Sequence, residues 1–288
     1  MANILGVGIA TLDIINYVDH YPNEDEELRA VSQRICRGGN VTNTLSVLSQ
    51  LDHQCFWCGV LCEDNDVQYI LDDLHTNNID HSYSQRIQQG KIPTSYITIN
   101  QKSGSRTIVH YRDLPELSYQ HFQTLLFDEI DWFHFEARAI NETCEMILEV
   151  KRRHPDARIS VEIEKPRDQL SEIFGLADLY LYSKHFAEAN GYQSPEVLLD
   201  AHKNLSPNAD LVCTWGEQGA HALLHNGEKH FSPAFSPQKV VDTLGAGDTF
   251  NAGLISALAN NINWLEALPF ACRLAGKKCG QTGLENLV

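Results

Sequence analysis

Short apolar segments alternate with amphipathic segments along most of the chain. Residues 3–9 are rich in Val and Ile and are bounded by polar residues, which predicts a buried strand. In residues 40–51 the apolar side chains recur at helical spacing behind a Gly-Gly turn, which predicts a helix. The alternation continues, with further strands predicted at 55–62, 131–135, 157–163, 177–183 and 209–215 and helices at 66–77 and 141–153. This order is typical of an α/β fold whose mostly parallel sheet is covered on both faces.

Two regions break this alternation. Residues 26–39 and 95–112 have the pattern of antiparallel strands, and the second region predicts a hairpin around 101–105. We therefore expect one core domain with a small β insert. The predicted core comprises residues 1–12, 39–92 and 113–288, and the predicted insert comprises residues 13–38 and 93–112.

Composition narrows the functional classes. The chain has 288 residues and a formal charge of −16, which argues against a surface for nucleic acid or anionic membrane. Small phosphorylated ligands stay compatible, since they need only a local cluster of donors. The first residues show no basic leader and no segment reaches eighteen apolar residues, so a cytoplasmic protein is expected. The eight cysteines are expected to be free thiols, because a reducing compartment is expected and no secretion signal is seen. A zinc site at Cys55, Cys58 and Cys62 would lack a fourth ligand.

Candidate chemistry begins with VVDTLGAGDTFNAG, residues 240–253. A carboxylate follows a pair of glycines there, where an apolar helix is expected to begin. The segment is not a P-loop, and Phe250 occupies the third glycine position of a dinucleotide fingerprint. Free N–H groups and the helix dipole suit a bound anion. Spacing alone leaves two interpretations: a plain glycine turn with Asp248 as a helix-terminal charge, or an anion site at which Asp248 acts on the substrate.

Several stretches resemble the ribokinase, or phosphofructokinase-B, family of sugar kinases. DTLGAGDTFNAG (242–253) is similar to the family's C-terminal signature, and RGGNVTNTLSVLSQLD (37–52) to its N-terminal signature. The similarity covers nearly the whole chain and points to the branch that phosphorylates ketohexoses. The further stretches that carry it are LDIINYVDHYPNEDEELR (12–29), SRTIVHYR (105–112), VEIEKPR (161–167) and AGKKCG (275–280).

The resemblance implies a three-layer α/β/α ribokinase-like sandwich with a small β-sheet lid. It implies ATP-dependent phosphorylation of the 1-hydroxyl of a ketohexose such as D-fructose, with Mg²⁺ brought by ATP. It also implies a homodimer joined through the lids, which would cover exposed strand edges. No nucleic-acid or membrane partner is expected.

The same resemblance assigns catalytic residues. Asp248 would be the base, because a positioned carboxylate can accept the proton of a weakly nucleophilic sugar hydroxyl. The N–H groups of Gly245, Ala246 and Gly247 would stabilise charge on the transferred phosphoryl group. Arg106 would lie near that group; taken alone, it would be a solvated strand charge.

The resemblance also assigns ligand-binding residues. The predicted sugar ligands are Asp13, Asp25, Gly38, Gly39, Asn40 and Asn43. Taken alone, Asp13 is either a buried acid at the end of an apolar strand or an exposed loop acid. Asp25 would be a solvated loop acid, and Asn40 a helix cap, which is compatible with sugar binding. The predicted nucleotide ligands are Trp215, Gly216, Gly219, Phe235, Gly247 and Cys272. Core packing is an equal alternative for Trp215 and Cys272.

Metal ligands are less well marked in the sequence. By the resemblance, Asp242 and Thr243 would hold a monovalent cation such as K⁺. Many family members carry an Asn-x-x-Glu motif for Mg²⁺, but Ser183 and Phe186 occupy those places here. Glu136 and Glu164 are then candidates for outer-sphere contacts to Mg²⁺, and no direct protein ligand of the ion is predicted.

Three other functions stay open at this point. One is a kinase of the same family for another sugar or a nucleoside. The second is a non-catalytic sugar or nucleotide sensor, which would not need Asp248 as a base. The third is a nicotinamide oxidoreductase, which the missing fingerprint disfavours.

Overall fold

The main sheet carries the architecture of the chain. The computed structural model describes residues 1–127 and 129–288. Nine strands form the sheet in the order β15-β14-β13-β12-β11-β10-β1-β4-β6. The strands from β13 to β6 run parallel, and β14 and β15 add an antiparallel edge. The strands are β1 Asn3–Val7, β4 Gln54–Cys58, β6 Ile79–Asp80, β10 Trp132–Glu136, β11 Arg158–Ile163, β12 Leu179–Tyr182, β13 Asp210–Thr214, β14 Ala220–Leu223 and β15 Lys229–Ser232.

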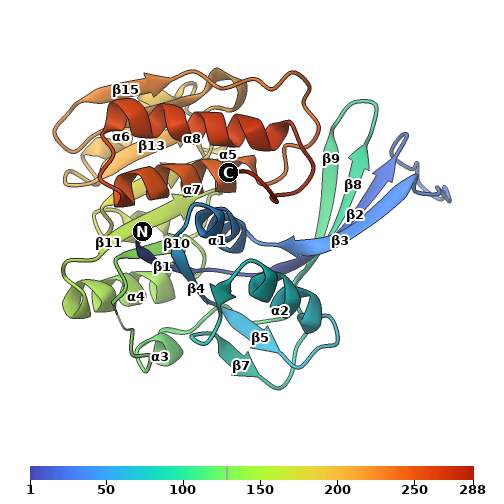
Figure 1. Cartoon of the computed structure of the whole chain (residues 1–288), viewed down its shortest axis with the longest axis horizontal. Coiled ribbons are helices and arrows are strands. Elements are labelled where there is room, and N and C mark those ends of the chain that lie inside the picture. Colours follow the sequence, from blue (N-terminus) through green and yellow to red (C-terminus); the bar gives the residue numbers. More distant parts are fainter. Residues whose placement is uncertain (128) are drawn as a thin grey trace.

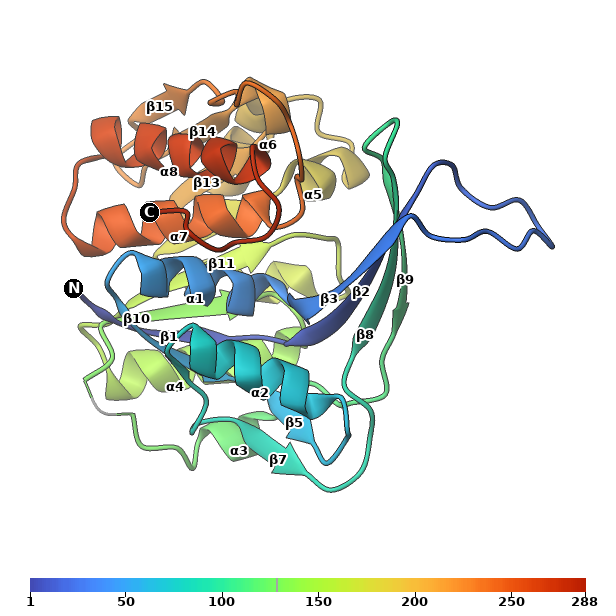
Figure 2. The same cartoon turned by 45° about the vertical axis from the view of Figure 1, so that its right-hand side comes forward.

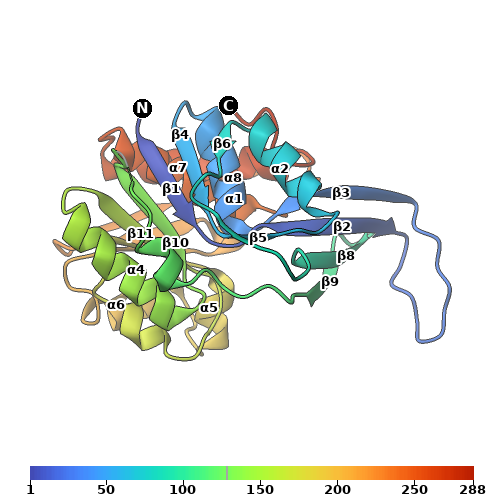
Figure 3. The same cartoon turned by 90° about the horizontal axis from the view of Figure 1, so that it is seen from below.

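Helices cover both faces of this sheet (Figure 3). On one face lie α1 Asn40–Gln50, α2 Val67–Thr76, α7 Ala246–Ala259 and α8 Trp264–Cys279. On the other lie α3 Tyr119–Phe122, α4 Ile140–Arg153, α5 Lys184–Ala189 and α6 Pro195–Lys203. Short 3₁₀ turns occupy Leu170–Ile173 and Gly216–Gln218. Each face packs its own apolar cluster, and β10 is buried along its length, as a doubly covered strand requires. The predicted three-layer α/β/α fold is confirmed.

Helix α7 is the most deeply buried of the helices that bear on the site. Its sequence is apolar on nearly every side, and it is buried from Asp248 to Leu258. It packs against α1 and α8. Gly253 permits the close approach of α8, because a Cβ there would lie 3.0 Å from the Cα of Ala271. This packing takes the Asp248 carboxylate out of solvent, whereas Gly247 before it stays exposed. Among the described helices, none is both long and apolar enough to cross a membrane.

A second sheet projects from one side of the α/β body (Figure 1). Its order is β3-β2-β8-β9. Its strands are β2 Thr11–Val18, β3 Ser32–Gly38, β8 Thr94–Asn100 and β9 Arg106–Tyr111. Strands β8 and β9 pair antiparallel around the turn at 101–105, so the predicted hairpin is confirmed. The loop between β2 and β3 extends away from the body (Figure 2).

Three details differ from the prediction. Residues 55–62 are not one strand, because the chain leaves the main sheet at Gly59 and continues as β5 (Val60–Cys62), which pairs with β7 (Gln85–Ile87). A side chain at Gly59 would collide with the ring of Trp57 at 2.2 Å. Residues 26–31 form no strand. The sequence also gave no signal for β2 as a separate strand, because its apolar run follows β1 with only a short break.

Candidate active site

The candidate site lies at the carboxyl ends of the parallel strands. Strand β1 has β4 on one side and β10 on the other, so the strand order reverses there. Ligands of open α/β sheets bind in the crevice at such a point. Helices α1 and α7, which pack against each other, both begin at this edge. The two signature stretches predicted from the sequence are thereby brought side by side.

The glycine turn before α7 is open to an anion. Gly245 precedes the helix with a φ of 81°, a conformation that favours glycine. Among the described residues, no side chain caps this helix, so the first-turn N–H groups keep their capacity to bind a ligand. A Cβ at Gly247 would meet no described atom within 4 Å, so there is open space in front of the turn. The anion interpretation of this segment fits the geometry.

Asp248 is the third residue of α7 and only 7% exposed. Its Oδ2 accepts a hydrogen bond of 2.7 Å from Nδ2 of Asn43, on α1. Burial raises the pKa of Asp248 to about 7; the hydrogen bond from Asn43 opposes this rise, while the charges of Glu164 and Glu136 add to it. A carboxylate with a pKa near neutrality is suited to accept a proton.

Asp13 lines a hollow that opens to solvent. The hollow measures about 500 Å³ and is lined by Asp13, Asn43 and Leu244, with Gly283–Glu285 closing one side. Asp13 is buried, and this burial raises its pKa although Thr11 donates a hydrogen bond of 2.8 Å to Oδ1. Asp13 is therefore a buried acid facing a hollow, and its interpretation as an exposed loop acid is wrong.

Two glycines leave room for this arrangement. A Cβ at Gly38 would lie 2.1 Å from Oδ2 of Asp13. Gly39 has a φ of 107°, and its Cβ would lie 2.2 Å from the carbonyl oxygen of Ile9. Neither position accepts a side chain without displacement of its neighbours. The Gly-Gly turn thus holds Asp13 and the start of α1 close together.

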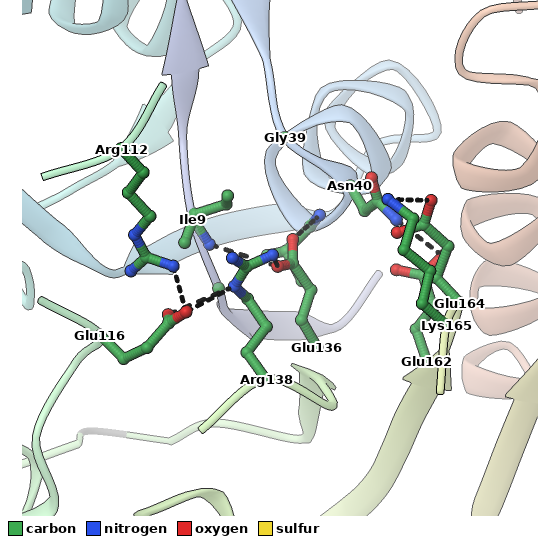
Figure 4. Close-up of polar contacts among 12 residues, drawn as sticks. Ile9, Gly39, Asn40, Arg112, Glu116, Glu136, Arg138, Glu162, Glu164 and Lys165 are labelled. Atoms are coloured by element: carbon green, nitrogen blue, oxygen red, sulfur yellow. Dashed lines mark hydrogen bonds and ion pairs between the residues drawn. The ribbon is translucent and has the colours of Figure 1, made fainter. Parts of the chain in front are cut away.

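Asn40 joins the start of α1 to a group of acids (Figure 4). Gly39 is the N-cap of α1, so the alternative of Asn40 as the cap is wrong. The Asn40 Nδ2 donates to Oε1 of Glu162 at 3.3 Å, and Asn251 of α7 donates to the same oxygen at 3.2 Å. Glu136 accepts from the N–H of Val41 at 2.9 Å. These contacts fix the beginnings of α1 and α7 to the ends of β10 and β11.

Arg106 and Asp25 have different positions relative to this edge. Arg106, on β9, donates to Oγ1 of Thr243 at 3.3 Å, so the second sheet reaches the glycine turn. Asp25 is exposed on the extended loop between β2 and β3 (Figure 2). Asp25 has no recorded hydrogen bond to the described residues around the hollow. The structure therefore brings Arg106 to the site and leaves Asp25 away from it.

The nucleotide candidates fall into two groups. Trp215 and Cys272 are buried in the two apolar clusters, which agrees with core packing for both side chains. Gly216 and Phe235 are exposed. Position 219 requires glycine, because its φ is 99° and a Cβ there would lie 2.0 Å from the carbonyl oxygen of Ser232. The exposed group and Gly219 lie on the β13–β14 and β15–α7 connections, beyond the glycine turn.

Asp242 already has a cation from the chain itself. The ammonium of Lys278, which is fully buried, donates to the Asp242 carbonyl oxygen at 2.8 Å and lies 2.9 Å from Oδ2. Burial alone would raise the pKa of Asp242, but hydrogen bonds from Lys278 and the N–H of Leu244 lower it below the ordinary value. The predicted monovalent-cation site stays a prediction, and any such ion would share Asp242 with this ammonium.

Four residues of this region were not predicted from the sequence. Lys278 stands in a helical lysine pair, where an exposed charge is the ordinary expectation. Arg37 and Glu162 lie inside the motifs that carry the resemblance, yet their types alone did not distinguish them from solvated charges. Asn251 lies on a largely apolar helix, and its amide side chain there could have marked it as a candidate.

Comparison with known proteins agrees with this geometry. The pfkB family carbohydrate kinase profile matches residues 1–288. The chain is 40% identical to ketohexokinase of Mus musculus over 293 aligned residues, covering 99% of this chain and 98% of that protein. It is 26% identical to ribokinase of Bacillus subtilis, covering 96% of this chain and 92% of that protein. The resemblance inferred from the motifs is confirmed.

Solved structures support the fold. A putative ribokinase from Agrobacterium tumefaciens superposes with a TM-score of 0.85 at 18% identity, covering 98% of this chain and 92% of that one. Ribokinase from Arabidopsis thaliana gives a TM-score of 0.80 at 18% identity, covering 98% of this chain and 94% of that one. At such identities these likenesses carry the fold alone. Together with the family profile and the sequence relatives, they establish that the chain is a carbohydrate kinase of the pfkB family.

Proposed function

We propose that this kinase transfers the γ-phosphoryl group of ATP to the 1-hydroxyl of a ketohexose such as D-fructose. The observation that carries the proposal is Asp248, a buried carboxylate on the first turn of α7 with a pKa near 7. A base must lie beside the anion site to act on a hydroxyl that attacks a phosphate. The similarity to mouse ketohexokinase supports the choice of sugar.

The chain's own residues perform three tasks in this proposal. Asp13, Asn40 and Asn43 bind and orient the sugar in the hollow, and Gly38 and Gly39 allow the backbone to approach it. Asp248 accepts the proton of the attacking hydroxyl. The N–H groups of Gly245, Ala246 and Gly247, with Arg106, stabilise charge on the transferred group. Holding both reactants in line accounts for much of the acceleration.

ATP and Mg²⁺ fit the described residues next to the glycine turn. The exposed Gly216 and Phe235 would contact the nucleotide, and the open space before Gly247 suits its phosphates. Oε2 of Glu162 is buried and has no hydrogen-bond partner among the residues that the structure describes. This oxygen, with Glu164 beside it, would accept hydrogen bonds from the water shell of Mg²⁺. The ion would neutralise phosphate charge when it is bound.

We also propose that the second sheet, residues 13–38 and 93–112, is a lid and a dimerisation surface. Strand β9 is an edge strand exposed along its whole length, and Val109 is 65% exposed. Such an edge tends to pair with another chain. Tyr96, opposite Val109 on β8, extends the apolar surface. Asp25 would reach a sugar only if its loop moves or if a second copy supplies it.

The test is ADP release from MgATP in a coupled assay, with fructose and a panel of sugars and nucleosides as acceptors. Fructose turnover that falls by about 10²–10⁴-fold in Asp248→Asn supports the base and the substrate. The control is Asp156→Asn, an exposed acid after α4, which should leave turnover unchanged. Turnover with another acceptor only would keep the mechanism and change the substrate. ATP binding without any turnover would refute the proposal in favour of a sensor.

The dimer is tested by sedimentation of the full chain. A charge at Val109, on the exposed edge, should convert a dimer into a monomer without loss of helical signal. A wild-type chain that sediments as a monomer at micromolar concentration contradicts this part of the proposal and leaves the kinase chemistry untouched.

A further inference from the structure

A buried chain of polar contacts leads from α2 to the candidate base. Arg37 is the penultimate residue of β3, and its side chain is only 3% exposed. Its Nε donates to Asp73 of α2, and its two terminal nitrogens donate to side chains of α1. One of them contacts Oδ1 of Asn43 at 2.8 Å. Asn43 then donates to Asp248 at 2.7 Å. Four elements are linked in this way: α2, β3, α1 and α7.

The contact with Arg37 decides which way the Asn43 amide points. A guanidinium only donates, so the atom of Asn43 that faces it must be the carbonyl oxygen. The amide nitrogen is then left to face Asp248, to which it donates. If the amide were turned over, its nitrogen would meet the guanidinium and its oxygen would meet a carboxylate. Both contacts would be repulsive, so Arg37 excludes this orientation.

The charges around Asp248 make this orientation consequential. The acids Glu162 on β11, Glu136 on β10 and Glu164 after β11 all disfavour its charge. Against them stand the hydrogen bond from Asn43 and the charge of Arg37, which both lower the pKa of Asp248. Arg37 thus acts on the base twice, once through the amide and once by its charge.

We propose that Arg37 is a positioning residue of the reaction, which fixes the Asn43 amide as a donor to Asp248 and so keeps the base in its proton-accepting form. This inference rests on the proposed function, because it takes Asp248 as the base. Arg37 itself is enclosed by Thr42, Asn43, Ser46 and Asp73, and it has no recorded contact with the glycine turn. Arg37 also lines the hollow, so the pH profile, and not the affinity for the sugar alone, identifies the positioning role.

The test compares pH profiles of kcat/KM in the full-length enzyme. Arg37→Met should move the midpoint of the acid limb up by about one pH unit, because an opposite charge and a hydrogen bond each favour the ionised acid. Turnover at pH 6.5 then falls by about tenfold and recovers above pH 8. Arg37→Lys keeps the positive charge but not the planar fork that serves four acceptors, so it should move the limb in the same direction by less than Arg37→Met. Arg86→Met, at an exposed arginine of β7, is the matched control.

Two further measurements keep the proposal falsifiable. In a double-mutant cycle with Asn43→Ala, the effects on the acid limb should be strongly non-additive, because Arg37 acts through Asn43. Additive effects, or a loss of activity that is equal at every pH, would overturn the proposal. Asp73→Asn weakens the anchor of Arg37 from α2 and should move the limb in the same direction by less, which covers the case in which Arg37→Met does not fold.

A readout without turnover separates this inference from the proposed function. The carboxyl carbon of Asp248, labelled with ¹³C and assigned with Asp248→Asn, reports its titration by NMR. A higher midpoint in Arg37→Met supports the positioning role even if no sugar is phosphorylated. An unchanged midpoint refutes it even if fructose is the substrate.

Discussion

Asp248→Asn is expected to make the protein more stable, and by an amount that depends on pH. The pKa of Asp248 in the folded chain is about 7, against an ordinary value of 3.8, chiefly because the carboxylate is buried. The native protein therefore holds a proton that the unfolded chain releases between about pH 4 and 7, and its stability falls as pH rises through that window. An amide at position 248 carries no charge, so the variant does not lose this stability.

The magnitude follows from the two pKa values. A pKa difference of one corresponds to 1.36 kcal/mol, so the gap from 3.8 to about 7 sets a ceiling of about 4 kcal/mol above pH 8. At pH 5.5 the unfolded aspartate is already ionised, and the same linkage gives about 2 kcal/mol. The advantage of the variant over the wild type should therefore widen by about 2 kcal/mol between pH 5.5 and pH 8.5. Acids remote from Asp248 titrate in both proteins and cancel in the comparison, whereas the pKa of Glu162, which the charge of Asp248 raises, falls in the variant and adds to the gap.

The assay is urea unfolding of both proteins at pH 5.5, 7.0 and 8.5, followed by circular dichroism. Asp156→Asn serves as the control, since an exposed acid should give a difference close to zero at every pH. A gap between Asp248→Asn and wild type that stays constant with pH would refute the reasoning, because it would mean that Asp248 is ionised throughout.

Two pairs of neighbouring residues give further predictions. Lys278→Met leaves the buried Asp242 with only the more distant guanidinium of Arg34, at 4.0 Å, and should cost about 3–5 kcal/mol in urea unfolding, whereas the adjacent, exposed Lys277→Met should cost almost nothing. Equal effects of the two lysines would show that the ammonium of Lys278 is not paired in solution. Gly245→Ala should cost about 1–2 kcal/mol, because its φ of 81° is strained for alanine. Gly247→Ala should gain up to about 1 kcal/mol of helix stability and yet lose turnover, because its methyl group enters the space meant for phosphate. Unchanged ADP release in Gly247→Ala would place the phosphate elsewhere.

The sequence predicted the α/β body well because its strands and helices follow simple hydrophobic periods. The strands at 131–135, 157–163, 177–183 and 209–215 each lie within one residue or two of an observed strand. These strands are buried on both faces, so they form continuous apolar runs that stand out against the amphipathic helices. The antiparallel additions were harder, because β14 and β15 have only four residues each and the apolar run of β2 follows β1 after a short break.

The site was predicted as a set of residues but not as a network. The motifs identified Asp248, Asn43 and Asp13; the fold brings Asn43 and Asp13 to one hollow and joins Asp248 to it through the hydrogen bond from Asn43. What the motifs did not reveal is how each side chain is held. Arg37 and Lys278 are residue types that usually lie on the surface, and only the packing of α1, α2 and α8 shows that they are buried. Burial of a charge depends on tertiary contacts, which a local pattern does not encode.

The placement of the raised pKa values indicates what this end of the sheet is built for. Asp13, Glu136, Glu162 and Asp248 are all buried near the beginnings of α1 and α7, and burial raises the pKa of each. By contrast, the pKa of Glu149 on α4 is lowered, chiefly by the hydrogen bond from Arg152. Four buried acids at one edge cost stability at neutral pH, and apolar side chains there would remove that cost. The apolar packing of the doubly covered sheet and of the buried α7 offsets this loss of stability and holds the acids where a sugar hydroxyl and a phosphate would meet. Stability is thus lowered at the place where the proposed chemistry needs a base that is neither permanently charged nor permanently neutral.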